Sequence, residues 1–178
     1  MFNTVYTFKF LQSDKYTNEP FLIEHLYSFK GKGNARYIVQ LQEFKHKFLA
    51  IKFYHKSHRF SKDKYSILTK KNDAQGCIRT CIEIMLSRYK LDNKVSFGFI
   101  GANLLGESIN NTKRFRIYKQ VMENFFSPIK FSHYSNPNDS TYLMLNNEML
   151  KVHPEFFQEI KKVYLTYYVS DKPTDDKE

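Results

Sequence analysis

The sequence has no tryptophan and only two cysteines, Cys77 and Cys81. One pair of cysteines excludes a disulfide-rich scaffold, and neither a Cys-x-x-Cys motif nor a His/Cys cluster with zinc-ligand spacing is present. The two residues lie four positions apart on one predicted helix, which points both side chains inward. We expect two buried, reduced thiols; a metal or redox role and an intermolecular bridge are the alternatives.

Long apolar segments are also missing. No run approaches the roughly 18 consecutive apolar residues that a membrane span needs, and the first ten residues lack the apolar segment of a signal peptide. We therefore expect a cytoplasmic protein without membrane association. The common nucleophile, phosphate-loop and metal-ligand motifs are absent as well, so we expect no metal site and no familiar hydrolase chemistry.

The composition indicates a globular protein. The 178 residues are 42% hydrophobic and 17% aromatic, which excludes a disordered chain. This length suits one domain with a substantial core. We predict a single domain over residues 1–169, followed by an acidic tail at 170–178.

The positive charge is concentrated in one quarter of the chain. Residues 30–71 contain twelve Lys or Arg and two acidic residues, whereas the remainder has 16 of each sign and is neutral. A lysine-rich composition with a solvated surface is one explanation. The other is a basic face that meets phosphate, either in nucleic acid or in a phosphorylated cofactor.

The first half of the chain is typical of β-structure. Residues 5–10 favour a short strand, and residues 11–24 favour a loop. Three β-rich runs then form a predicted antiparallel meander, followed by a fourth strand; these segments are residues 26–30, 35–44, 47–55 and 65–69. Alternation in the meander predicts an apolar face and a wet, basic face carrying Gln40, Gln42 and Lys52.

The second half mixes helices and strands. Apolar residues at three- and four-residue spacing predict a helix of about 17 residues from Ala74, capped by Asp73 or Asn72. A strand follows at 95–102, and it is apolar on both faces, as a central strand would be. Three further elements are predicted: a helix from 113 to about 126, a hairpin of residues 129–134 and 141–146, and a terminal helix that begins near Pro154.

This α+β order, with a mostly antiparallel mixed sheet, resembles the GNAT acetyltransferase superfamily over about residues 27–146. The resemblance equates residues 65–69 with the strand that precedes the family's cofactor-binding helix. It also extends to uncharacterised bacterial families in which the second helix carries a basic residue and, one turn later, a tyrosine, as in TKRFRIYK. It implies a cleft between diverging strands and acetyl-CoA as the cofactor.

The family's phosphate loop reads Q/R-x-x-G-x-G/A. With Gly76 as its first glycine, Asp73 stands where the family has Gln or Arg, and Ile78 replaces the small residue. An aspartate there repels a pyrophosphate and caps the helix N–H groups itself. The resemblance implies an altered cofactor site, whose candidate residues are Lys70, Lys71, Gln75 and Gly76.

Two residues are candidates for catalysis. Tyr118 matches the family's tyrosine that protonates the leaving thiolate, a role that requires hydrogen-bond reach of the sulfur. The alternative is core packing, because Tyr118 shares an apolar stripe with Phe115 and Val121. Glu107 follows the central strand and is a candidate base near the mouth of a cleft.

Basic residues in two places are candidates to bind nucleic acid. In the 30–71 segment they alternate with aromatic residues that can stack on bases. On the second helix they lie at the N-terminus, where the helix dipole disfavours cations unless an anion is near. The candidates are Lys52, Lys56, His58, Arg59, Lys113, Arg114, Arg116 and Lys119.

The sequence therefore predicts a GNAT-like basic domain that binds a phosphate-bearing partner. Nucleic acid is favoured, in a non-catalytic or toxin- or defence-type module. An acyltransferase that uses acetyl-CoA, with Tyr118 as general acid, is the alternative. An interaction module whose basic face meets an acidic protein is the third.

Overall fold

The protein folds around one mixed sheet. The computed structural model describes residues 3–67, 73–100, 102 and 106–169. Within these residues, seven strands are ordered β1-β2-β3-β4-β5-β7-β6, and four α-helices accompany them. Every neighbouring pair is antiparallel except β4 with β5. The predicted α+β class with a mostly antiparallel mixed sheet is confirmed.

The elements have the following bounds. The strands are β1 (Phe8–Lys15), β2 (Ile23–Lys30), β3 (Arg36–Phe44), β4 (Phe48–His55), β5 (Ser96–Ile100), β6 (Phe131–Asn136) and β7 (Thr141–Asn146). The helices are α1 (Ala74–Leu91), α2 (Lys113–Phe125), α3 (Asn147–Val152) and α4 (Phe156–Val169). Helix α3 was not predicted; its N-cap is Asn146, whose side chain accepts a 3.0 Å hydrogen bond from Glu148 N.

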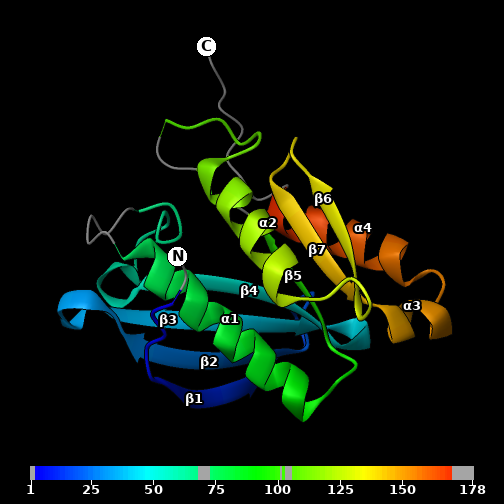
Figure 1. Ribbon diagram of the computed structural model, residues 1–178, viewed down its shortest axis with the longest axis horizontal. Helices are drawn as coiled ribbons and strands as arrows, with labels where there is room; N and C mark the ends of the chain where they lie inside the picture. The colour runs from blue at the N-terminus through cyan, green and yellow to red at the C-terminus, as the bar shows by residue number, and fades with distance from the viewer. Residues whose placement is uncertain (1–2, 68–72, 101, 103–105, 170–178) are drawn as a thin grey trace.

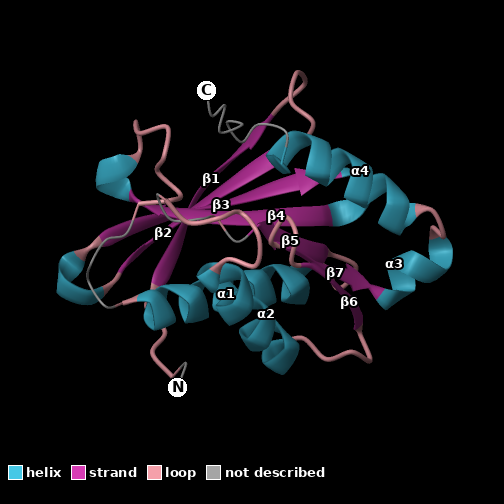
Figure 2. Ribbon diagram, turned by 90° about the horizontal axis from the view of Figure 1, so that it is seen from above, coloured by secondary structure: helices cyan, strands magenta, loops and turns pink. Residues whose placement is uncertain are grey.

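Helices cover both faces of the sheet. Figures 1 and 2 show α1 and α2 on one face and α4 on the other. Successive side chains of one strand point to opposite faces of the sheet. Leu49 of β4 packs in the core under α1 and α2, and Phe48 packs in the core under α4. Among the described helices, none is both long and apolar enough to cross a membrane.

Strand β5 is buried on both faces, as its sequence predicts. Phe97 and Phe99 point into the core under α1 and α2. On the other side, a Cβ on Gly98 would lie 2.4 Å from Cζ of Phe48 and 2.9 Å from Cδ2 of Leu143. This position therefore requires glycine, because two buried side chains occupy the space that any larger residue needs.

The parallel contact between β4 and β5 is short. Only three residue pairs form its ladder, from Phe48 opposite Ser96 to Ala50 opposite Gly98. Strand β4 continues to His55 and β5 to Ile100 without further pairing to each other. The two antiparallel halves of the sheet thus meet over the first residues of β4 and diverge beyond them.

Two predictions for the N-terminal half are wrong. Residues 11–15 belong to β1 rather than to a loop, because they continue pairing with β2 after an irregularity at Leu11. Tyr65, Ser66 and Ile67 form turn and irregular backbone rather than a strand; residues 68 and 69 lie outside the described residues. The strand that precedes α1 is therefore β4.

The predicted wet face of the meander is also wrong for its two glutamines. Gln40 is 9% exposed and Gln42 is 5% exposed. Their amide groups donate to Glu24, at 3.0 and 2.8 Å. Their oxygens accept from Tyr65 and from Tyr168 of α4. Buried polar groups need such partners, and the tyrosines that supply them are distant in the sequence.

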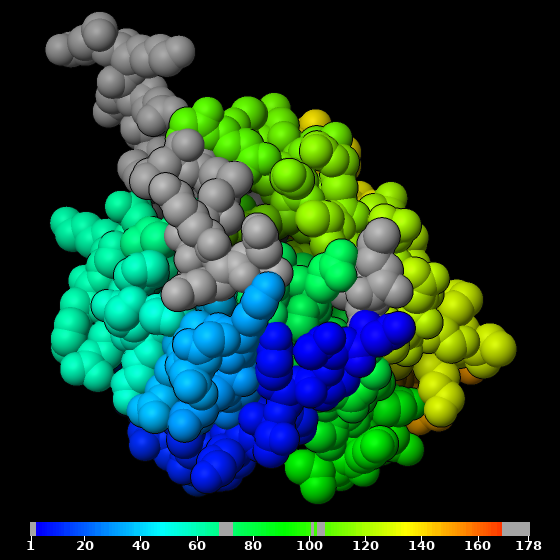
Figure 3. Space-filling model, turned by 60° about the vertical axis from the view of Figure 1, so that its left-hand side comes forward, coloured from blue at the N-terminus to red at the C-terminus, as the bar shows by residue number. Residues whose placement is uncertain are grey.

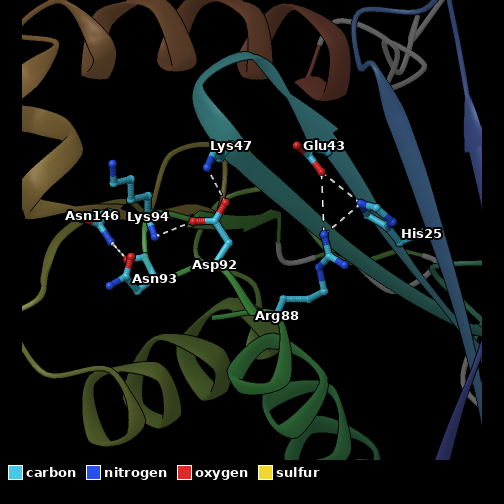
Figure 4. A network of polar contacts seen from close by, with 8 residues as sticks. All are labelled: His25, Glu43, Lys47, Arg88, Asp92, Asn93, Lys94 and Asn146. Carbon is cyan, nitrogen blue, oxygen red and sulfur yellow. Dashed lines mark hydrogen bonds and ion pairs between the residues drawn. The ribbon is translucent and has the colours of Figure 1, made fainter. Parts of the chain in front are cut away.

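Polar contacts fix the C-terminal end of α1 against the meander (Figure 4). The guanidinium nitrogen Nη2 of Arg88 lies 3.2 Å from Nε2 of His25. The same His25 atom lies 3.0 Å from Oε2 of Glu43. Beyond the helix, Asp92 accepts a hydrogen bond from Lys47 at the β3–β4 turn. These contacts hold the turn end of the β3–β4 hairpin against α1 and the residues that follow it.

Candidate functional site

A basic groove lies at the end of the β3–β4 hairpin that is remote from its turn. It is a shallow, open hollow of about 560 Å³, lined by Asn34, Ala35, Arg36, His55, Lys56, Ser57, Arg59 and Phe60. Figure 3 shows the contributing segments on one face, with the turquoise residues after β4 projecting beside the light-blue loop before β3. None of the described lining residues is acidic, so the groove presents positive charge.

Antiparallel pairing brings the walls of this groove together. Tyr37 of β3 stands opposite His55 of β4, so Arg36 lies across from the residues that follow β4. The buried Tyr37 ring packs edge-on against the His55 ring at 5.4 Å. The strand ends thus place Arg36 beside Lys56, although the two residues are twenty positions apart in the sequence.

The segment after β4 is held by its own hydrogen bonds. Residues Lys56–His58 form a short 3-10 helix, and His55 Nδ1 lies 2.6 Å from Oγ of Ser57. The next turns are closed by Arg59 N donating to Lys56 O at 3.2 Å and Ser61 N donating to His58 O at 2.9 Å. Lys56, Arg59 and Phe60 therefore sit on a defined turn.

Basic residues lie at both ends of the β3–β4 hairpin. At the turn end, Lys47 pairs with Asp92 and His46 lies 3.1 Å from Glu159. At the groove end, Arg36, Lys56 and Arg59 have no ion pair with any described residue. The positive charge of these three groove residues is thus not neutralised by any described carboxylate.

Of the eight residues predicted to contact nucleic acid, the structure brings three together. Lys56 and Arg59 line the groove, and His58 packs beside it with its ring 5.4 Å from that of His55. The His58 Nδ1 atom is buried and has no hydrogen-bond partner among the described residues. Sequence reasoning missed Arg36, because only the β3–β4 register shows that it reaches this site.

Lys52 lies elsewhere, on the face of the sheet that α4 covers. Its ammonium group is 4.1 Å from the ring centroid of Tyr168 and 5.3 Å from that of Tyr65. Cation–π contacts of this kind are stronger in a partly desolvated place. The side chain therefore belongs to the contact between α4 and the sheet rather than to the groove.

The four basic residues of α2 do not form one cluster. Arg114 donates to the carbonyl oxygen of Tyr65, and Arg116 donates to that of Asn111. Arg116 and Lys119 line a second hollow of about 350 Å³, which also contains Glu123. Lys113 is exposed at the helix start. These cations are therefore spread around the helix, with a carboxylate among them.

Tyr118 lies where α2 packs on β5. Its ring meets Phe99 edge-on at 4.9 Å, and the residue packs against the main core. Burial raises the pKa of Tyr118, and the nearby guanidinium of Arg114 opposes this effect. The hydroxyl is therefore protonated at neutral pH, which suits either packing or proton donation.

Glu107 is placed at the N-terminus of α2. Its Oε1 atom accepts a 2.9 Å hydrogen bond from Lys113 N. Thr112 is the N-cap, and its hydroxyl accepts from Phe115 N at 3.1 Å. A carboxylate is favourable at the positive end of a helix. This contact explains the position of Glu107, and its role as a base stays a prediction.

The proposed cofactor loop is covered by the N-terminal segment. A Cβ on Gly76 would lie 2.6 Å from the ring of Tyr6, so the close approach at this glycine is made by Tyr6. Asp73 begins α1 but does not cap it with its side chain. Instead, its carboxylate accepts from Tyr6 Oη at 2.6 Å and from Lys32 N at 2.8 Å.

Of the remaining cofactor candidates, the structure describes only Gln75. Gln75 is exposed on the first turn of α1, and Lys70 and Lys71 lie outside the described residues. In α1, Cys77 and Cys81 are buried free thiols, as predicted. Burial, reinforced by the carboxylate of Asp73, raises the pKa of Cys77 to about 12, so this thiol is not a ready nucleophile.

Metal chemistry has no support in the part of the chain that the structure describes. No three His, Cys, Asp or Glu side chains there gather to hold an ion. Known proteins offer no guide to function either: no family model, no curated protein and no solved structure matches this chain. Its function is therefore inferred from its own side chains.

Proposed function

We propose that this protein binds nucleic acid through the basic groove. The observation that carries the proposal is the convergence of Arg36, Lys56 and Arg59 on one concave surface where no described lining residue is acidic. Phosphates along a nucleic-acid backbone need several such cations at fixed spacing. Arginine also grips phosphate through two parallel hydrogen bonds.

The groove also carries an aromatic ring, which separates nucleic acid from an acidic protein as the partner. Phe60 lies at its edge and is 86% exposed. A carboxylate-rich surface gains little from a phenyl ring, whereas nucleobases stack on one. Asp63, the single acidic residue of the 56–67 segment, is exposed and does not line the groove.

Fluorescence anisotropy with labelled DNA and RNA oligonucleotides over a salt series tests this proposal. For single strands, each phosphate contact contributes about −0.7 to the slope of log K against log salt, so three cations give about −2. Raising salt from 50 to 200 mM then weakens binding about 18-fold. The double variant Lys56→Gln/Arg59→Gln retains only the phosphate contact of Arg36. Its affinity is expected to fall only about 2.6-fold over the same salt range.

The matched control is Lys45→Gln/Lys151→Gln. It removes the same charge from two exposed lysines outside the groove. Binding that is insensitive to salt, or a control that weakens binding as much as the groove variant does, contradicts the proposal. Binding of a poly-glutamate peptide in preference to both oligonucleotides assigns the groove to an acidic protein instead.

A second candidate is acyl transfer from acetyl-CoA by a GNAT-like domain. The observation that favours it is the sheet order, in which the parallel pair β4 and β5 separates after three residue pairs while Tyr118 packs against β5. The position of Tyr6 over Gly76 weighs against it, because that ring fills the approach a pyrophosphate would use.

Calorimetry with acetyl-CoA tests this candidate. Micromolar affinity, together with acetylation of polyamine or peptide amines that Tyr118→Phe abolishes without weakening cofactor binding, supports it. The absence of any heat of binding at high micromolar acetyl-CoA removes it.

A further inference from the structure

The ring of Phe60 has one open face. Phe60 is 86% exposed, and the carbon at the centre of the Arg59 guanidinium lies 4.5 Å from its ring centroid. The guanidinium therefore rests against one face of the ring. The opposite face is available to a ligand, and a flat group that stacks there extends a guanidinium–phenyl stack by one layer.

Arg59 can support this stack and still contact phosphate. A guanidinium is planar, so it stacks through its face while its N–H groups donate from its edge. No described carboxylate pairs with Arg59. One side chain thus supplies both a backing for the ring and donors for a phosphate beside the stacked group.

Hydrogen bonds order the backbone that carries Phe60. The hydrogen bonds from Arg59 N to Lys56 O and from Ser61 N to His58 O close two successive turns, and the second turn contains Phe60. Ser57 Oγ, at 2.6 Å from His55 Nδ1, ties the same segment to the end of β4. The backbone of this segment is therefore ordered, which fixes the point at which the Phe60 side chain leaves the chain.

We infer that the groove binds single-stranded nucleic acid, with one unpaired base stacked on Phe60 and the adjacent phosphates held by Arg36, Lys56 and Arg59. The inference rests on the proposed function and adds the class of nucleic acid and the residue that selects it. In a duplex each base face is covered by its neighbours, so only an unpaired base offers a free face to the ring.

The test compares three probes of equal length: an oligothymidylate, an abasic strand with the same phosphates, and a duplex. Stacking of one base changes affinity by about 5- to 150-fold. We expect the wild-type protein to prefer oligothymidylate over the abasic strand within that range. Phe60→Ala removes this preference and leaves the salt slope unchanged, whereas Phe60→Tyr retains the preference.

Ile129→Ala is the matched control, because Ile129 is an equally exposed apolar residue (85%) that lies outside the groove. Equal affinity for the abasic strand and oligothymidylate, or duplex binding at least as tight as single-strand binding, overturns the inference. In either case a steep salt dependence that the groove cations control still supports the proposed function. If the wild-type protein shows no salt-dependent binding to any of the three probes, both the inference and the proposed function are rejected.

Discussion

The hydrogen bond from Tyr6 to Asp73 provides a direct test of how the N-terminal segment is held on α1. Asp73 is 7% exposed, and its Oδ1 atom accepts from the Tyr6 hydroxyl at 2.6 Å. Tyr6→Phe removes this donor and leaves the carboxylate with the bonds from Lys32 N at 2.8 Å and from the Cys77 thiol at 3.7 Å. A hydrogen bond to a charged group contributes about 1.5–3 kcal/mol, and the partial exposure of Tyr6 places the expected loss near 1–2 kcal/mol.

The pH dependence of this loss has a definite sign. The hydrogen bond to Asp73, with burial, raises the pKa of Tyr6 to about 12 from its usual value of 10.0. A raised pKa stabilises the folded protein fully below the ordinary pKa, and that contribution disappears as the pH rises from about 10 to about 12. The stability difference between wild type and Tyr6→Phe should therefore be constant up to about pH 9 and shrink above pH 10.

Urea unfolding of both proteins at pH 7, 9 and 11 measures these differences. Tyr134→Phe is the control, since its hydroxyl makes no hydrogen bond in the described residues and its ring stacks on Phe157 at 4.2 Å. Equal stability of wild type and Tyr6→Phe at pH 7 refutes the reasoning. So does a difference that persists unchanged at pH 11.

Three further changes have expected effects on stability. Gly98→Ala places a methyl group against Phe48 and should lower the free energy of unfolding by about 1–3 kcal/mol in a urea titration; an unchanged midpoint contradicts the packing of β5. Thr112→Ala removes the N-cap of α2 and should cost about 1 kcal/mol, most of which Thr112→Ser restores; equal losses in both variants point to packing instead. The hydrogen bond from Lys47 holds the pKa of Asp92 below its usual value, so its stabilisation is present above about pH 4 and lost as the pH falls through the lowered pKa. Asp92→Asn should therefore cost about 0.5 kcal/mol at pH 7 and nothing near pH 2 in thermal scans; a pH-independent cost excludes the ion pair as its origin.

Local patterns predicted the elements whose side chains alternate between core and solvent. Helix α1 follows from the three- and four-residue spacing of Cys77, Ile78, Cys81 and Met85, all of which are buried. The strand predicted at residues 5–10 ends before Gln12, Ser13 and Asp14, because these residues show no apolar alternation. These residues form an exposed edge strand, which β2 holds by main-chain pairing.

The candidate site was only partly predictable, because it depends on contacts between distant residues. Lys56 and Arg59 are visible in the sequence as neighbours, whereas Arg36 joins them only through the register of β3 and β4. The sequence pattern places Tyr65 in a strand. Its hydroxyl instead bonds to Gln40, and no local pattern could reveal that contact.

The short ladder between β4 and β5 has a consequence for the order of folding. Strands β1 to β4 pair successively with their neighbours in sequence, and β6 and β7 form a hairpin. Each group closes short loops, while the pairing of Ala50 with Gly98 requires the whole intervening chain, including α1, to be brought back. We therefore expect the meander to form early and the joining of the two sub-sheets to be a late event. During synthesis the meander would then have to remain soluble with its β4 edge uncovered until β5 emerges.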